Sequence, residues 1–360
     1  MRKESNSLSH FTVQKFKKNT SGLLSFIVIC IYGLIAIFCY AISPDSSSNA
    51  NQMHLEIHSK QPGYQVMMFE KASNKKKSFF NFILEGQEIP NIEIPISNYS
   101  IQNDTLFLSE LNSQKKELTY SLNQLNHPPE NYIKTKIFYF GTDRYGRDLL
   151  SRILVGTRIS FFIGFIAVFI SLILGISIGA LAGYFGGKID TFVMWIINIT
   201  WSIPTLLLVI AITLALGKGF WQVFIAVGLT MWVEVARVVR GQILSTKKLQ
   251  YIEAARALGY SNFRIISKHI LPNIIGPIIV ISAANFAGAI LIESGLSFLG
   301  IGAQPPTPSW GGIIKDHFNY IILGKPYLAI IPGLAIMSLV MSFMLIGNAL
   351  RDALDVKTKS

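Results

Sequence analysis

Charge is scarce in this sequence. Of its 360 residues, only 14% are Asp, Glu, Lys or Arg, whereas 51% are hydrophobic, and the mean hydropathy is +0.44. An average soluble domain carries about 25% charged residues, so this composition excludes an ordinary soluble domain. The net charge of +12 does not indicate nucleic-acid binding, because no basic patch on a polar module is interleaved with aromatic residues.

Cysteine and histidine are also scarce. The two cysteines, Cys30 and Cys39, lie nine residues apart in one apolar run. Two positions that far apart on a straight helix cannot form a disulfide, and their spacing matches no metal site. None of the six histidines lies in an apolar run, so an intramembrane hydrolase would lack its buried base. We therefore predict no catalytic residue and no metal site.

A phosphate-binding loop is missing as well. The chain has Gly-Lys pairs at 187–188, 217–218 and 324–325, but none has a glycine five positions before its own. The pattern G-x-x-x-x-G-K-[ST] needs that first glycine to cradle phosphate with backbone N–H groups. We therefore expect no ATP, no magnesium and no other cofactor in this chain, and no enzymatic activity of its own.

Long apolar runs are what the chain has instead. A run of about 20 apolar residues spans the bilayer core of about 30 Å, and it must be helical because backbone groups cannot stay unpaired in lipid. The sequence predicts an all-α polytopic membrane protein with six transmembrane helices. The runs are 22–43, 159–184, 191–216, 220–240, 273–296 and 327–349.

Basic residues predict the orientation of these helices. The first run is longer than the apolar core of a signal peptide, about 7–15 residues, so we expect it to be retained. Lys and Arg gather in the tail at 1–21, in the loop at 241–272 and in the tail at 351–360. Because short cytoplasmic segments are enriched in Lys and Arg, and six spans return the chain to its starting side, we expect both termini and this loop in the cytoplasm.

The longest polar stretch, 44–140, then lies on the opposite side. It is rich in Ser, Asn, Gln and Lys, and it contains the short alternating pieces HLEIHS, YQVMMFE, FFNFILEG and TLFLS. Such alternation is typical of β-strands. We predict a small extracytoplasmic insertion of β character, with a disordered linker as the alternative.

Glycine and proline mark special points within the spans. Gly175, Gly179, Gly183 and Gly187 recur every fourth residue, which places them on one helix face and lets a neighbouring helix approach closely. Pro204 lies inside the third run, where it removes a backbone hydrogen bond, so it predicts a kink, with a gating role as the alternative.

Few ionisable residues fall within the runs. Glu234 and Arg237 lie one turn apart near the predicted cytoplasmic end of the fourth run, where they can pair along the helix. Glu293 lies near the outer end of the fifth run, and an ionisable residue there is a candidate for gating or for the transport path. The rest of the membrane midplane is nearly free of charge, which disfavours a secondary transporter coupled to ions through buried acids.

An amphipathic segment follows the fifth run. Ser309 can cap a helix, after which Trp310, Ile313 and Ile314 share one face. The sequence predicts an interfacial helix that lies against the outer membrane surface. We expect His317 to be a surface residue and not a ligand.

The loop at 246–272 separates the fourth and fifth runs. Its residues up to Leu258 are good helix formers, and Gly259 stands where a glycine ends a helix. Glu253 offers a fixed acid, while the small side chains of Ala254 and Ala255 let another surface come close. This pattern predicts a short helix that docks a partner protein.

The same loop resembles a known family. EAARALG at 253–259, followed by LP at 271–272, is similar to the EAA loop of bacterial ATP-binding-cassette import permeases. Further segments resemble the C-type permease of the dipeptide, oligopeptide and nickel import branch, and they lie at 141–160, 182–190, 232–244 and 293–314. The resemblance covers the first helix and about 138–352. Two departures are His269, where the pattern has an apolar residue, and an insertion at 45–130 that is longer than expected.

The resemblance implies a role for each part of the chain. The implied parts are a cytoplasmic basic tail at 1–21, a first helix at 22–43, the insertion at 44–140, a transmembrane domain at 141–350 and a cytoplasmic tail at 351–360. The loop would be a coupling helix seated in a groove of a separate ATPase subunit. Its implied coupling residues are Glu253 for a polar contact, Ala254 and Ala255 for close packing, Gly259 for the turn, and Arg256 and Leu258 beside them.

The resemblance also implies the partners and the location. These are a second homologous permease, two ATPase subunits that bind ATP and Mg²⁺, an extracytoplasmic solute-binding protein and lipid, in the bacterial inner membrane. The cargo would be di- or oligopeptides, with nickel or another small solute as the alternative. Alternatives from a different class are an ion-coupled secondary transporter and a non-transporting membrane scaffold.

Overall fold

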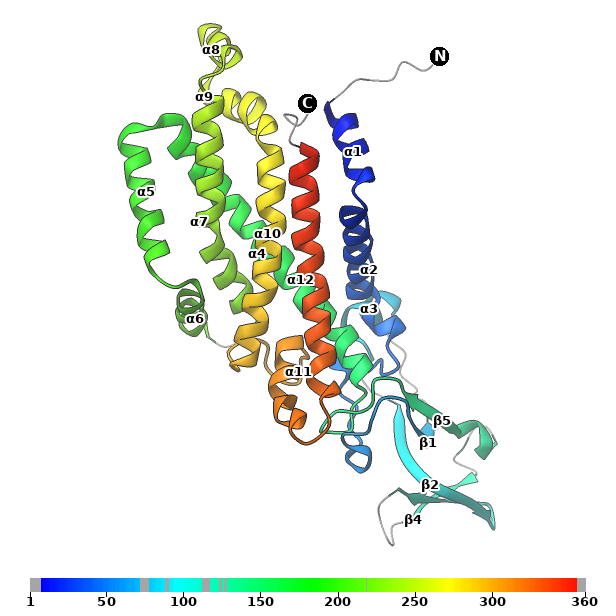
Figure 1. Ribbon diagram of the computed structural model, residues 1–360. Helices are drawn as coiled ribbons and strands as arrows, with labels where there is room; N and C mark the ends of the chain where they lie inside the picture. Colours follow the sequence, from blue (N-terminus) through cyan, green and yellow to red (C-terminus); the bar gives the residue numbers. More distant parts are fainter. Residues whose placement is uncertain are drawn as a thin grey trace, which may run out of the picture. The chain divides into compact units, whose positions relative to one another are not determined.

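A computed structural model describes residues 8–71, 78–87, 91–111, 117–122, 125, 128–217 and 219–354 of the chain. Parts of both predicted basic tails, and residue 218, lie outside these residues. The described chain is mainly helical, as predicted, and carries a small sheet (Figure 1). It divides into two compact units: 1–33, 160–304 and 335–360 form the first, and 34–159 and 305–334 form the second.

Among the residues that the structure describes, five single helices are long and apolar enough to cross a membrane. They are α2 (Thr20–Ile42), α4 (Leu149–Phe185), α7 (Phe220–Thr246), α10 (Ile275–Phe298) and α12 (Tyr327–Leu354). Both α4 and α7 are longer than the apolar runs that predicted them, because polar turns continue the helix beyond the run. A shorter helix, α1 (Leu8–Lys18), precedes α2.

The third predicted span is broken and not merely kinked. α5 (Gly187–Ser202) and α6 (Thr205–Leu216) are bent by 93° across the break, and they make a sixth span only if the pair counts as one. Ile203 is extended at φ −96° and ψ 127°. Proline lacks an N–H and disfavours the helical region for the residue before it, so Pro204 ends α5. The prediction of one kinked helix was wrong, and a gating role for Pro204 stays a prediction.

Three of the four spaced glycines pack α4 against α7. A β-carbon at Gly179 would lie 2.5 Å from the carbonyl oxygen of Ala236, and β-carbons at Gly175 and Gly183 would also meet α7 at 3.0 Å or less. Without side chains here, the two backbones touch. Gly187 was predicted on the same face, but α4 ends at Phe185. It begins α5 at φ +54° with open space around it, so that prediction was wrong.

The second unit contains a five-stranded antiparallel sheet in the order β4-β3-β2-β1-β5. Its core includes Phe69, Leu106, Leu108 and Tyr132. The strands are β1 (Tyr64–Lys71), β2 (Ile92–Gln102), β3 (Thr105–Glu110), β4 (Glu117–Ser121) and β5 (Ile133–Phe138). Buried and less buried side chains alternate along β3, whereas in β1 the adjacent Met68 and Phe69, which point to opposite faces of the sheet, are both buried.

The strand prediction is confirmed for two of four pieces. YQVMMFE forms β1 and TLFLS forms β3, but FFNFILEG forms the helix α3 (Phe79–Glu85) and HLEIHS forms the 3₁₀ turn η2 (Leu55–Ile57) with its flanks. Other short 3₁₀ turns are η1 (Ser48–Ala50) and η4 (Pro129–Tyr132). Short apolar pieces do not by themselves distinguish strands from helical turns.

The predicted interfacial helix is packed into the protein. α11 (Trp310–His317) is capped by Ser309, whose hydroxyl accepts a hydrogen bond from the Gly312 N–H at 3.2 Å. Trp310 is fully buried, and its indole N–H donates to the Ile153 carbonyl at 3.1 Å. Ile313 is buried and Ile314 is half-buried. The apolar face therefore covers protein and not lipid, and α11 is followed by η7 (Phe318–Ile321).

His317 is buried, so its prediction as a surface residue was wrong. Its Nδ1–H donates to the Ile313 carbonyl at 2.7 Å, and its Nε2 accepts from the Arg144 N–H at 3.2 Å. Burial lowers the pKa of His317 below 6.5, although the Ile313 hydrogen bond and the nearby Asp143 and Asp316 act in the opposite direction. Both ring nitrogens are satisfied only while the imidazole is neutral.

We expect the protein to lose stability as the pH falls below about 6.5, the unfolded value for His317. Because the folded pKa is lower than this, the unfolded state binds more protons in that window. His317→Gln should flatten the decline of the melting temperature between pH 7.5 and 5, measured on purified protein in detergent. His58→Gln, at an exposed histidine, should keep the wild-type slope. Equal slopes in wild type and H317Q would contradict this role.

Gly179→Val should disrupt the contact between α4 and α7. The added carbons would overlap the backbone of Ala236, and overpacking of this kind costs about 1–3 kcal/mol. The melting temperature in detergent should fall clearly below that of the wild type. Gly241→Val is the control, because a β-carbon at this α7 glycine meets nothing within 4 Å. The packing role would be refuted by equal melting temperatures for the two variants.

Candidate functional site

The α7–α10 loop, residues 247–274, is built from short helical pieces. α8 (Gln250–Ala257) comes first, followed by α9 (Asn262–Arg264), the π-helical turn η5 (Ile265–Ile270) and the 3₁₀ turn η6 (Leu271–Asn273). At its start, the Lys247 ammonium donates to the carbonyl oxygen of Gly183 at 2.9 Å. A cation at a helix C-terminus satisfies carbonyls that have no partner within the helix. The loop is therefore tied to the end of α4.

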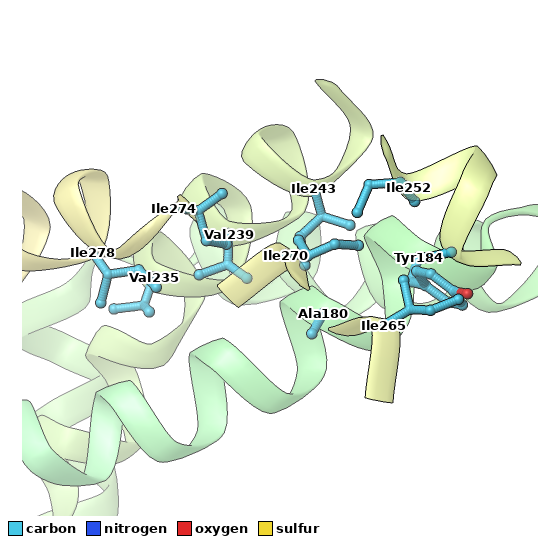
Figure 2. Close-up of a cluster of buried hydrophobic side chains, with 11 residues drawn as sticks. Ala180, Tyr184, Val235, Val239, Ile243, Ile252, Ile265, Ile270, Ile274 and Ile278 are labelled. Atoms are coloured by element: carbon cyan, nitrogen blue, oxygen red, sulfur yellow. The ribbon is translucent and has the colours of Figure 1, made fainter. Parts of the chain in front are cut away.

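The inner face of the loop is packed into a hydrophobic cluster (Figure 2). Ile252 and Ala255 of α8 are buried there with Ile265 and Ile270 of the second half of the loop. The same cluster contains Ile274 at the end of the loop and side chains of α4, α7 and α10, namely Ala180, Tyr184, Val235, Val239, Ile243 and Ile278. Burying one isoleucine side chain contributes about 1.5–3 kcal/mol. This cluster links α8, together with the second half of the loop, to the three membrane helices.

Ala255 therefore differs from its predicted role. It is only 5% exposed and belongs to the cluster of its own chain, so its small side chain lets α8 approach the membrane helices and not a partner. Ile252 and Ala255 are three residues apart and share a helix face. That spacing is the signal in the sequence that could have assigned Ala255 to the inner face.

The outer face of the loop carries exposed residues. The structure exposes Glu253, Ala254 and Arg256. These three residues were predicted to lie at the contact with the ATPase, and their exposure leaves them accessible to a partner. Leu258 is 71% exposed and Phe263 is 80% exposed. Exposed apolar side chains that gather beside a charge are typical of an interaction site. Phe263 was not predicted, although an aromatic residue just after a helix cap is a visible signal.

Gly259 ends α8 with a Schellman motif. The Tyr260 N–H donates to the Ala255 carbonyl at 3.2 Å, and the Gly259 N–H donates to the Arg256 carbonyl at 3.0 Å. Gly259 has φ +75°, a left-handed conformation that costs other residues about 1–2 kcal/mol. The predicted turn is present at this glycine, and it redirects the chain towards α9.

Aromatic contacts hold the second half of the loop. The Tyr260 ring stacks on His269 with 5.6 Å between centroids, and the Arg264 guanidinium lies 4.1 Å from the Tyr260 centroid. The Tyr184 hydroxyl donates to the Asn262 Oδ1 at 2.8 Å. His269, which departs from the family pattern, is therefore part of a stack within the loop.

An ion pair joins α5 to α7 on the same side. The guanidinium of Arg240 forms two hydrogen bonds to the carboxylate of Asp190, one of them 2.6 Å long from Nη2 to Oδ2. A bidentate pair fixes orientation as well as distance. The pair connects α5, which follows α4 in the chain, to α7, which leads into the loop.

Glu293, a predicted gating or path residue, is buried among serines. It is 0% exposed, and the Ser297 hydroxyl donates to its Oε1 at 2.7 Å. The Ser297 hydroxyl also accepts from the Ala303 N–H at 3.2 Å. This chain of hydrogen bonds fixes the turn after α10. The geometry favours a structural role, and a path role stays a prediction.

The predicted pairing of Glu234 with Arg237 is not formed between these two described residues. The Arg237 guanidinium lies 4.3 Å from the centroid of the Trp201 ring instead. Because α7 extends from Phe220 to Thr246, Glu234 lies near the middle of this helix and not near its end. The prediction of a nearly uncharged midplane stays a prediction.

Comparison with known protein families gives a match that includes this loop. The family model described as "Binding-protein-dependent transport system inner membrane component" matches residues 175–360, which include the whole α7–α10 loop. The chain belongs to this family. Members of the family are membrane components of transport systems, so the chain is a permease component in the inner membrane and not the ATPase.

Several curated relatives in the family are similar over most of their length. They are the glutathione transport system permease protein GsiD of Pectobacterium atrosepticum (39% identity, 67% of this chain, 78% of the relative), the dipeptide transport system permease protein DppC of Alkalihalophilus pseudofirmus (40%, 71% and 82%) and the oligopeptide transport system permease protein OppC of Haemophilus influenzae (42%, 61% and 71%). A weaker likeness covers 56% of this chain and 95% of a chain in an inward-facing structure of the MetNI methionine ABC transporter. It has 19% identity and a TM-score of 0.48.

Gly259→Val should loosen the end of α8. Valine adopts the φ of +75° poorly, whereas asparagine tolerates it. We expect faster amide hydrogen exchange over residues 250–260 in G259V, measured by mass spectrometry, and near wild-type exchange in G259N. If the amide hydrogens of G259V exchanged as slowly as those of the wild type, the Schellman motif would not be what stabilises the end of α8.

Proposed function

We propose that this family member is one of two homologous permeases in an ATP-driven importer of short peptides. Two separate ATPase subunits would bind ATP and Mg²⁺, and an extracytoplasmic solute-binding protein would deliver the cargo. The observation that carries the proposal is the α7–α10 loop. Its inner face is built into the cluster of three membrane helices, whereas its outer face presents an acid and exposed apolar side chains.

The packing supports a coupling role for α8. Because Ile252 and Ala255 share one cluster with α4, α7 and α10, a displacement of α8 is transmitted directly to these helices. Protein interiors are close-packed and pass on strain without absorbing it. Closure of the ATPase subunits would therefore move the helices that surround the transport path. Glu253, Ala254, Arg256, Leu258 and Phe263 are the residues proposed to touch the ATPase.

The proposed orientation places this loop and both termini in the cytoplasm. Basic residues gather at this end of the helices, namely Lys247, Lys248, Arg256, Arg264 and Lys268. This enrichment is typical of cytoplasmic loops. The sheet of the second unit would then lie outside the cytoplasm, where it is available to the solute-binding protein.

Glu253→Lys and Leu258→Asp should each uncouple the permease from its ATPase. E253K reverses the exposed charge, and L258D places a charge in an apolar contact. Burial of one leucine side chain contributes about 1.5–3 kcal/mol, which is about tenfold to a hundredfold in affinity. We expect co-purification of the ATPase and ATP-driven uptake into vesicles to fall by about that factor. Glu130→Lys, a charge reversal at an exposed position of the second unit, is the matched control and should leave both unchanged.

Unchanged uptake and co-purification in both E253K and L258D would rule out the coupling role. Uptake that needs an ion gradient and no ATP would support a secondary transporter instead. A complex that moves no solute, with or without ATP, would indicate a membrane scaffold.

The relatives favour peptides as the cargo, since their names specify dipeptides, oligopeptides and glutathione. Proteoliposomes that contain the complete complex should accumulate labelled di- and oligopeptides when ATP is supplied, and they should not accumulate nickel. ATP-driven nickel uptake without peptide uptake would replace the proposed cargo and leave the coupling mechanism intact.

A further inference from the structure

A cavity of about 370 Å³ lies among α5, α6, α7 and α10 of the first unit. Its polar lining includes Thr200, Thr205, Thr230, Glu234 and Asn285, and Met231, Leu208, Leu291 and Ile292 supply apolar surface. Small-molecule sites have volumes of about 300–1,000 Å³, with mostly apolar walls and a few converging polar groups. The cavity has room for the end of a peptide.

Glu234 lies in the middle of the membrane-spanning helix α7. It is 14 residues from Phe220 and 12 from Thr246, which is about 21 Å and 18 Å along the helix at a rise of about 1.5 Å per residue. A carboxylate within a transmembrane helix is costly unless water or a partner meets it. An ionisable residue there is therefore a candidate for contact with what crosses the membrane.

No residue that the structure describes forms a hydrogen bond or an ion pair with Glu234. Arg237, one turn away, lies over Trp201. Glu293, the acid near the end of the fifth apolar run, accepts hydrogen bonds from serine hydroxyls. Glu234 is exposed within the isolated chain and lines the cavity, so its carboxylate is available to a ligand.

Thr200, Thr230 and Asn285 present acceptors to the cavity, whereas Trp201, also in its lining, has an indole N–H that can only donate. The Thr200 hydroxyl donates to the Ile196 carbonyl at 2.9 Å, and the Thr230 hydroxyl donates to the Val227 carbonyl at 2.8 Å. Because each hydroxyl uses its hydrogen on its own helix, it offers lone pairs elsewhere. The Asn285 Nδ2 contacts the Met231 carbonyl at 3.5 Å, and its Oδ1 is also an acceptor.

We propose that this cavity binds the protonated amino terminus of a peptide in transit, with Glu234 as its counter-ion. A primary ammonium carries three N–H donors and one positive charge, which fits one carboxylate surrounded by acceptors. An anionic or acceptor-rich group would be repelled. This inference rests on the proposed peptide cargo and identifies the part of the peptide that the permease recognises.

The expected binding is weak, as transit requires. A hydrogen bond to a charged group contributes about 1.5–3 kcal/mol net, which corresponds to a factor of about 10 to 100 in affinity. Such an increment would favour entry of a free amino terminus without retaining the peptide. It would also let the permease discriminate against peptides with blocked amino termini.

Glu234→Gln tests this inference by removing the charge and keeping the shape. We would measure binding of labelled Ala-Ala-Ala and of its N-acetylated form to the purified permease–ATPase complex without binding protein, by equilibrium dialysis. We expect wild type to bind the free peptide about 10 to 100 times more tightly than the acetylated one. E234Q should bind both weakly and equally, and Glu234→Asp should restore part of the preference.

Uptake provides the second readout. In complete proteoliposomes, E234Q should lower the rate of ATP-driven uptake of the free peptide, while co-purification of the ATPase remains as in the wild type. Glu130→Gln makes the same chemical change at an exposed position of the second unit, and it should leave binding and uptake unchanged.

Three results would overturn the inference. They are an equal preference for the free peptide in wild type and E234Q, an equal loss of both peptides in E234Q, and loss of the second permease from purified E234Q, which would assign Glu234 to the subunit interface. If the wild type imports no peptide, the proposed cargo is wrong. The comparison of free and acetylated peptide still decides whether the cavity holds an ammonium group.

Discussion

The hydrophobic cluster that joins α8 to the membrane helices is the constraint on which the rest of this protein depends. A short helix of eight residues is marginal in isolation, so α8 keeps its place because Ile252 and Ala255 are buried in the cluster that also contains side chains of α4, α7 and α10. The same contact leaves the opposite face of α8 free. One packing interaction thus both stabilises the loop and orients the surface that a partner can reach.

The helices beneath the loop are held to one another by different physical means. Close backbone packing at Gly175, Gly179 and Gly183 joins α4 to α7, and packing of this kind replaces the hydrophobic effect within lipid. The Asp190–Arg240 ion pair joins α5 to α7, and Lys247 ties the start of the loop to the end of α4. These contacts make the end of the bundle nearest the loop a connected body through which movement of α8 can spread.

The two acids within α7 and α10 show how the surroundings decide the role of a residue. Glu293 is enclosed and accepts hydrogen bonds from serine hydroxyls, so its carboxylate is used within the chain. Glu234 lies at a cavity and has none of these neighbours among the described residues. Both are single glutamates in apolar runs, and sequence patterning favoured Glu293 as the functional one.

Local features of the chain were readable from the sequence alone. Apolar length predicted the membrane helices, the pattern around Gly259 predicted the end of α8, and the spacing of three glycines predicted a close contact, because each depends on neighbouring residues along one helix. The tertiary structure decided the 93° break at Pro204, the inward position of Ala255 and the partners of Glu234, Glu293 and His317. These depend on which distant segments meet, and a one-dimensional pattern does not contain that information.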